Sequence, residues 1–226
     1  MSIFSNNVVD EWGTSYQLTA AGYTLLIVIM IAILLGACLI SGQNGKTKMS
    51  IKQLVFSAMA IALATVTSYL KLLHLPMGGS ITLFSMLFIC LIGYWYGLRS
   101  GLMAAIAYGF LQLIIDPYII SIPQMLCDYI FAFGALGLSG LFYNKKHGLI
   151  LGFVTGVLGR YFFSFLSGMI FFGSYAADYN MSAPIYSLVY NGAYLGGEAL
   201  ITLILLVLPP VERGLARVKV MAGESV

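Results

Sequence analysis

The sequence predicts an all-α protein that crosses a membrane several times as a single bundle. Of its 226 residues, 60% are hydrophobic and only 8% are charged, and the mean hydropathy is +0.95. A soluble domain carries about 25% charged residues. The apolar residues form long runs and not the short alternating segments of an outer-membrane barrel. The length suits one bundle and not two domains.

Seven apolar runs are candidates for membrane helices, since a span needs about 20 apolar residues. The predicted helices are residues 17–41, 51–71, 81–97, 101–115, 124–143, 148–172 and 184–209. The first of them ends near "LLGAC", which is similar to a lipoprotein cleavage box at Cys38. The preceding region contains Asp10 and Glu11 and no Lys or Arg, which is the wrong charge for a signal peptide. We therefore expect residues 17–41 to remain as a transmembrane helix.

Short joints separate the later helices. The segment "LPMGGS" forms a turn before the third helix, and "YGLRSG" joins the third to the fourth. The segment "DPYIISIP" separates the fourth from the fifth, because Pro117 and Pro123 interrupt helices. These joints predict a path that alternates between the two sides of the membrane.

The basic residues agree with this alternating path. Nine of the eleven fall in joints on one side of it: Lys46, Lys48, Lys52, Arg99, Lys145, Lys146, Arg213, Arg217 and Lys219. Positive charge gathers on cytoplasmic loops, so the N-terminus is predicted outside and the C-terminus inside. The basic residues are scattered over loop ends, and we expect no nucleic-acid partner.

Three ionisable residues fall at membrane depth, where a charge is costly and is a functional suspect: Asp128, Arg160 and Glu198. Asp128 is near the outer end of its helix, within reach of water, and we favour a ligand-binding role for it. Arg160 either pairs with a carboxylate to hold helices together or meets a ligand. For Glu198, in "GGEAL", we favour a structural role in bringing helices close together over a functional one.

One helical face and a set of outer aromatic residues point to a pocket. In "RYFFSFLSGMIFFGSYA", Arg160, Ser164, Gly168 and Phe172 recur every four residues and so share a face. Aromatic residues gather near the outer boundary: Tyr118, Phe171, Phe172, Tyr175, Tyr179, Tyr186 and Tyr190. They form either an interfacial belt or an aromatic cage. A cage with one carboxylate suits a small, planar, cationic ligand, and Asn191 adds a donor and an acceptor.

Enzyme chemistry has little support in the sequence. Cys38, Cys90 and Cys127 lie singly in apolar runs, with no spacing that indicates a metal site or a disulfide. We expect no metal, no cofactor and no catalytic residue. The chain also has no Gly-rich phosphate loop, so an ion gradient or a separate subunit must supply energy.

Longer motifs bring in a family resemblance. The segment "GGSITLFSMLFICLIGYWYGLRSGLMAAIAYGFLQLIIDPYIISIPQMLCDYIFAFGALGLSGLF", followed by "RYFFSFLSGMIFFGSYA" and "PIYSLVYNGAYL", resembles the thiamine-specific S-components of energy-coupling factor (ECF) transporters, the ThiT/YuaJ family. The resemblance covers about residues 51–208. It implies a six-helix membrane bundle with a vitamin pocket near the outer face, formed by the second to seventh helices, with residues 17–41 as an addition.

The resemblance also implies site residues. The family's acidic position matches Asp128, and its "YS--YN" motif matches Tyr186 and Asn191. Its basic position matches Arg160, its glycine position matches Gly168, and one of its aromatic positions matches Phe172. We add Tyr118 to this predicted ligand-binding set. The family typically has histidine where this chain has Ser164. The ligand is therefore expected to be thiamine or a close relative, with a thiamine precursor or a pyridoxine-like vitamin as the alternative.

Partners follow from the same resemblance. S-components dock on a transmembrane coupling subunit that carries two ATPases, and docking uses small residues on the first family helix. Ala58 and Ala62 match that stripe, with Ala60 and Ala64 on a nearby face. An ion-coupled secondary transporter, with Asp128, Arg160 and Glu198 as a relay, is the less favoured alternative because we detect no inverted repeat.

The predicted organisation has three parts in a prokaryotic plasma membrane. Residues 1–50 hold the N-terminal tail, the extra helix and a cytoplasmic linker. Residues 51–212 form the six-helix S-component domain, and residues 213–226 form a cytoplasmic tail.

Overall fold

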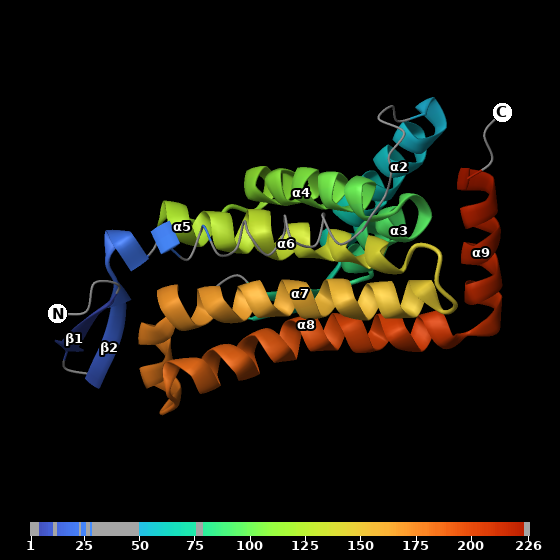
Figure 1. Cartoon of the computed structure of the whole chain (residues 1–226). Coiled ribbons are helices and arrows are strands. Elements are labelled where there is room, and N and C mark those ends of the chain that lie inside the picture. The colour runs from blue at the N-terminus through green and yellow to red at the C-terminus, as the bar shows by residue number, and fades with distance from the viewer. Residues whose placement is uncertain are drawn as a thin grey trace.

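The computed structural model describes residues 5–10, 13–22, 24, 25, 28, 50–75 and 79–223. Helices dominate it, and Figure 1 shows most of them running lengthwise, with one helix across the end near the C-terminus. Five helical segments are long and apolar enough to cross a membrane, and a shorter apolar helix lies among them. The predicted fold class, a helical multi-pass membrane protein, is confirmed.

The elements follow the predicted order. The helices are α2 (Ile51–Ser68), α3 (Ser85–Tyr96), α4 (Leu98–Ile115), α5 (Ile122–Met125), the π-helical turn η2 (Leu126–Phe131), α6 (Ala132–Gly134), the 3₁₀ segment η3 (Ala135–Phe142), α7 (Gly148–Phe171), the 3₁₀ segment η4 (Gly173–Tyr179), α8 (Ala183–Val207) and α9 (Pro209–Gly223). Two antiparallel hairpins accompany them: β1 (Ser5–Asp10) with β2 (Gly13–Leu18), and β3 (Lys71–His74) with β4 (Ser80–Thr82).

Six of the predicted spans correspond to α2, α3, α4, the α5–η3 segment, α7 and α8. Most of the predicted first helix, residues 17–41, lies outside the described residues. Residues 17 and 18 belong to β2 instead. The two hairpins and α9 were not predicted. The helix predicted for residues 51–71 ends earlier, at Ser68, where the hydroxyls of Thr65, Thr67 and Ser68 all bond back to carbonyls of the preceding turn.

The fifth span, from Ile122 to Phe142, is irregular along its length. Pro123 occupies its first turn, and the Ser121 hydroxyl caps it by accepting from the Gln124 amide. The following π turn contains Asp128 and Tyr129. π turns inside helices add a residue and often occur at functional sites. The turn therefore sets the direction in which Asp128 projects.

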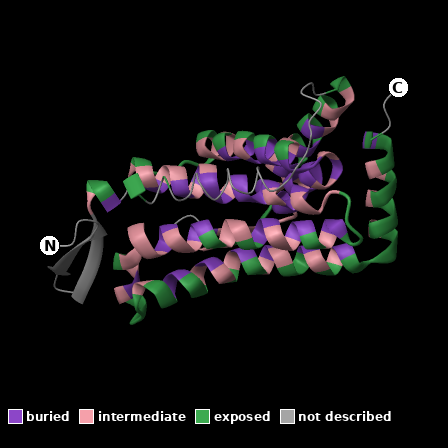
Figure 2. Ribbon diagram, in the orientation of Figure 1, coloured by how far each residue is buried: buried purple, intermediate pink, exposed green. Residues whose placement is uncertain are grey.

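The half of the bundle nearer α9 is packed backbone against backbone. A Cβ placed on Gly137 would lie 2.5 Å from the main chain of Gly101 and Leu102, so η3 and α4 are in direct main-chain contact. Small residues permit this approach between membrane helices. Buried side chains of α3, such as Met86, Ile89 and Ile92, fill the surrounding core. Figure 2 shows the buried positions concentrated there.

Helix α9 crosses the end of the bundle, beyond the prolines that terminate α8 (Figure 1). Its apolar side chains Val211, Leu215 and Val218 pack on the core. The Lys219 Nζ donates to the Tyr143 carbonyl at 2.5 Å and lies 3.9 Å from the centroid of the Tyr94 ring. Residues predicted as a cytoplasmic tail are thus folded onto the bundle as far as residue 223.

Candidate functional site

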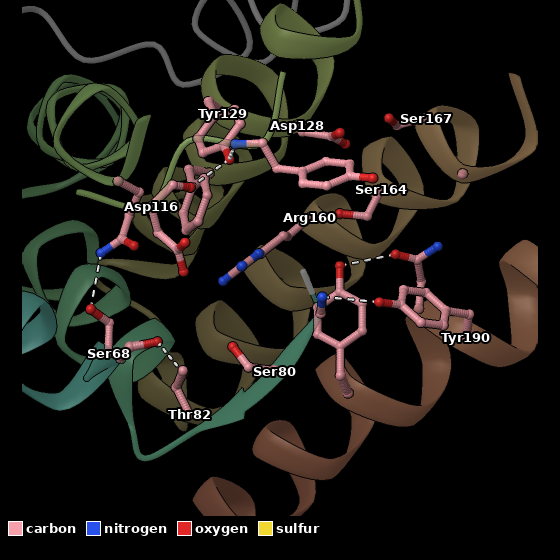
Figure 3. Close-up of a pocket in the computed structure, with 18 of the residues that line it drawn as sticks. Ser68, Ser80, Thr82, Asp116, Asp128, Tyr129, Arg160, Ser164, Ser167 and Tyr190 are labelled. Atoms are coloured by element: carbon pink, nitrogen blue, oxygen red, sulfur yellow. Dashed lines mark hydrogen bonds between the residues drawn. The ribbon is translucent and has the colours of Figure 1, made fainter. Parts of the chain in front are cut away.

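A cavity of about 370 Å³ opens at the end of the bundle away from α9. Its walls come from the β3–β4 hairpin and from residues of α2, α3, α4, the α5–α6 segment, α7 and α8 (Figure 3). All eight residues predicted to bind ligand line it: Tyr118, Asp128, Arg160, Ser164, Gly168, Phe172, Tyr186 and Asn191. Residues spread over some 70 positions of sequence therefore meet in one space.

Asp128 is held by a buried glutamine one turn before it. The Gln124 Nε2 donates to the Asp128 Oδ2 at 2.6 Å and to the Tyr118 carbonyl at 3.0 Å. The Gln124 Oε1 accepts from the Ile120 amide, and the side chain is 1% exposed. Gln124 thus fixes both the carboxylate and the α4–α5 linker. Ser167 of α7 lies next to the same carboxylate (Figure 3).

Arg160 extends from the middle of α7 into the space that the labelled residues surround (Figure 3). Its guanidinium carbon lies 4.1 Å from the centroid of the Phe133 ring, a cation–π contact. Within the described part of the chain, Lys71–Asp116 is the ion pair that forms, and the buried Arg160 Nε has no hydrogen-bond partner. The structural interpretation, in which Arg160 pairs with a carboxylate, is not supported. The guanidinium remains available to the cavity.

Glu198 lies outside the cavity lining and is 3% exposed. Its carboxylate accepts from the hydroxyls of Thr82 and Ser85 and from the Met86 amide. This agrees with the structural interpretation favoured from the sequence.

Aromatic rings form two stacked groups on the cavity walls. Tyr118 stacks on Phe172 at 5.9 Å between centroids. Tyr186 stacks on Tyr190 at 5.7 Å, and Tyr179 continues that stack at 5.3 Å. The predicted aromatic set thus divides. Tyr118, Phe172, Tyr186 and Tyr190 line the cavity, Tyr175 and Tyr179 extend the stacks, and Phe171 packs against a separate cluster.

Asn191 and Gly168 shape the α7–α8 wall. The Asn191 Nδ2 donates to the Ser187 carbonyl at 2.9 Å, and its Oδ1 accepts from the Tyr194 hydroxyl at 2.9 Å. Asn191 therefore orients Tyr194 toward the cavity. A Cβ on Gly168 would collide with the Ser187 hydroxyl, so glycine lets the two helices approach. Ser164, 7% exposed, lies on the same wall.

Several lining residues were not predicted, because the contacts that place them join distant parts of the chain. Lys71 and Asp116, 45 residues apart, form an ion pair of 2.8 Å at the cavity rim. The Gln112 Nε2 donates to the Ser68 hydroxyl at 3.1 Å. The Tyr190 hydroxyl accepts from the Gly79 amide at 2.9 Å, which ties the hairpin to α8. Of these, the aromatic pattern indicated only Tyr190.

The arrangement suits a small planar ligand with a cationic or amino-bearing group for Asp128 and an acceptor for the Arg160 guanidinium. Two groups of ring faces offer stacking, and the Asp128 carboxylate lines the same cavity. Hydroxyls of Ser80 and Ser164 add donors and acceptors. Across the described residues, no group of three His, Cys, Asp or Glu side chains could hold a metal ion.

Comparisons with known proteins agree with one another. Residues 54–216 match the family described as thiamine transporter protein (Thia_YuaJ). The chain is 34% identical over 168 residues to the thiamine transporter ThiT of Bacillus subtilis (strain 168), covering 68% of this chain and 85% of that protein. Its fold is similar to that of ThiT from Listeria monocytogenes, with a TM-score of 0.61 and 26% identity, covering 72% of this chain and 96% of that one.

Proposed function

Because the chain belongs to the thiamine transporter protein family, we propose that it captures thiamine as the membrane S-component of a vitamin importer. The family resemblance drawn from the sequence is confirmed, and a transporter subunit, not an enzyme, is the class it implies. The observation that carries the proposal is the single cavity in which all eight predicted ligand-binding residues meet.

Thiamine has the chemistry that this cavity accommodates. It joins an aminopyrimidine to a cationic thiazolium, so it has two flat rings, an amino donor and a positive charge. The ring faces of Tyr118, Phe172 and Tyr186 offer stacking partners, and the Asp128 carboxylate offers an acceptor and a counter-charge. We propose these four residues as its main contacts.

The alternatives from the sequence differ in support. Ser164 is small, so the wall beside it leaves room for another heteroaromatic ring, such as a thiamine precursor or a pyridoxine-like vitamin. An ion-coupled relay has less support, because Glu198 lies outside the cavity and bonds to two hydroxyls and an amide. The relay would require Glu198 to face Arg160 or Asp128.

Calorimetric titration of the purified, ligand-stripped protein tests the ligand. Thiamine is expected to bind saturably, at one site, and at least ~10-fold more tightly than pyridoxine or the isolated pyrimidine, since only thiamine combines both rings with the charge. Saturation by pyridoxine, with no heat from thiamine, would assign the scaffold to another vitamin.

We also propose the partners and orientation that the family resemblance implies. The chain would dock on an ECF coupling subunit with two ATPases, in a prokaryotic plasma membrane, with its N-terminus outside and C-terminus in the cytoplasm. Residues 51–212 would be the S-component domain, residues 213–226 a cytoplasmic tail, and residues 1–50 the tail, extra helix and linker. The docking face is supported by the exposure of Ala58 and Ala62 on α2, whereas Ala60 and Ala64 are only 2% and 0% exposed.

Ala58→Leu tests the docking face. The larger leucine side chain on this exposed stripe of small residues should prevent the coupling subunit from packing closely against α2. Thiamine uptake in cells should therefore fall by ~10-fold or more. Thiamine affinity of the purified variant should stay unchanged, because Ala58 is remote from the cavity lining. The matched control is Ala193→Leu, at another exposed alanine, on α8. Equal uptake by both variants would remove Ala58 from the docking face.

A further inference from the structure

Glu198 makes a set of contacts that a helix-packing residue does not need. Its carboxylate accepts from the Thr82 Oγ1 at 2.5 Å, the Ser85 Oγ at 3.0 Å and the Met86 amide at 2.9 Å. All three donors belong to the β4–α3 junction, more than 110 residues away in sequence. In the described portion of the protein no basic side chain forms an ion pair with Glu198. The three donors are therefore its stabilising partners.

The junction lacks a cap of its own. Phe84 occupies the N-cap position of α3 with a φ of 65°, and its side chain makes no capping bond. The Met86 amide is one of the first-turn N–H groups that no carbonyl of the same helix can satisfy. Glu198 supplies that acceptor from α8, and its negative charge lies at the positive end of the α3 dipole. Glu198 thus caps α3 from another helix.

The same junction forms part of the cavity wall. Thr82 and Ser85 both line the cavity, although Glu198 does not. A second link joins α8 to this region, since the Tyr190 hydroxyl accepts from the Gly79 amide. Tyr190, Tyr194 and Glu198 recur every four residues on one face of α8. One face of α8 therefore contacts both ends of strand β4, through Tyr190 at Gly79 and through Glu198 at Thr82. The Tyr194 ring lies between these two contacts on the same helix face.

We infer that Glu198 is a positioning residue for ligand retention, which holds the Thr82–Ser85 wall against α8 without touching the ligand. The inference rests on the proposed function, because it assumes that this cavity binds thiamine. Without the carboxylate, the junction loses three acceptor contacts and its helix cap, so the wall separates from α8 more often. A bound molecule then escapes faster, whereas the encounter that brings it in changes little.

Glu198→Gln tests this in the full chain with radiolabelled thiamine. Glutamine keeps the length of the side chain and one acceptor oxygen for Ser85 and the Met86 amide, but it loses the charge, and its NH₂ group cannot accept the bond that Thr82 donates to the second oxygen. The dissociation rate should rise ~10-fold or more, and the association rate should change by less than about threefold. The control is Thr202→Val, one turn further along α8, where a buried hydroxyl donates only to the Glu198 carbonyl. Its dissociation rate should match that of the unaltered protein.

Hydrogen–deuterium exchange of the ligand-free protein supplies the second readout. Exchange at residues 79–88 should increase in Glu198→Gln and not in Thr202→Val. If Glu198→Gln does not fold, Thr82→Val leaves the carboxylate two donors and should show a smaller increase at the same residues. Unchanged dissociation and exchange in a folded variant would overturn the inference. Failure of the unaltered protein to bind thiamine would instead overturn the proposed function, since the exchange comparison needs no ligand.

Discussion

Asp128→Asn is expected to weaken thiamine binding by about 100-fold or more, the largest loss of affinity that we predict for one substitution. The carboxylate lines the cavity, where Gln124 donates to one of its two oxygens, so it can still meet a positively charged or amino-bearing ring. Removing one member of such a desolvated pair costs about 2–5 kcal/mol. Asparagine keeps the size and one acceptor oxygen, so the fold should be retained. Calorimetric titration measures the affinity.

Asp116→Asn is the matched control for this substitution. Asp116 also lines the cavity, but its side chain is 63% exposed at the rim, paired with Lys71. Exposed ion pairs contribute about 0–1 kcal/mol, so thiamine affinity should change less than about fivefold. Unchanged affinity in Asp128→Asn would remove Asp128 from the site. Equal losses in both variants would mean that overall negative charge, and not the position of Asp128, attracts the ligand.

Gly137→Ala should cause a large loss of stability. The new Cβ would lie 2.5 Å from the main chain of Gly101 and Leu102, and backbone atoms cannot rotate aside. Overpacking of this kind costs about 1–3 kcal/mol, and more where main chain must move. A thiol-reactive dye can follow thermal unfolding in a Cys38→Ser background, because Cys90 and Cys127 are buried and free. We expect a clearly lower midpoint than for the unaltered protein.

Gly196→Ala supplies the opposite case on α8. A Cβ there meets nothing within 4 Å, and alanine favours a helix over glycine by about 1 kcal/mol. The midpoint temperature of thermal unfolding should stay unchanged or rise. If Gly137→Ala unfolds at the same temperature as Gly196→Ala, then η3 and α4 are not in main-chain contact.

The sequence predicted what depends on local periodicity. The six spans from α2 to α8 were found because each is a long apolar run, with ends marked by prolines, glycines and charges. The lining set was found because Arg160, Ser164, Gly168 and Phe172 share one face of a helix, and the family resemblance supplied the facing helices. Regular helical spacing is enough for such residues.

Contacts between distant segments account for what was missed. The start of α3 depends on Glu198, which follows it by more than 110 residues, because Phe84 at the N-cap position has no capping side chain. The β3–β4 hairpin was missed because residues 75–80 were predicted as a simple turn and residues 81 and 82 as the start of the third helix, and its link to α8 requires the Tyr190 hydroxyl. The π turn at Asp128 has no sequence signal of its own, because each residue in it is acceptable in an ordinary helix.

The contrast between the two ends of the bundle affects how this architecture can diverge during evolution. Near α9, glycines such as Gly137 and Gly140 admit almost no substitution, because main chain meets main chain. Around the cavity, side chains such as Ser164 and Phe172 face open space, where a change of size alters the fit and not the fold. Mutational tolerance should therefore form a gradient along the bundle axis. New ligand specificities can arise at one end while the other keeps the scaffold unchanged.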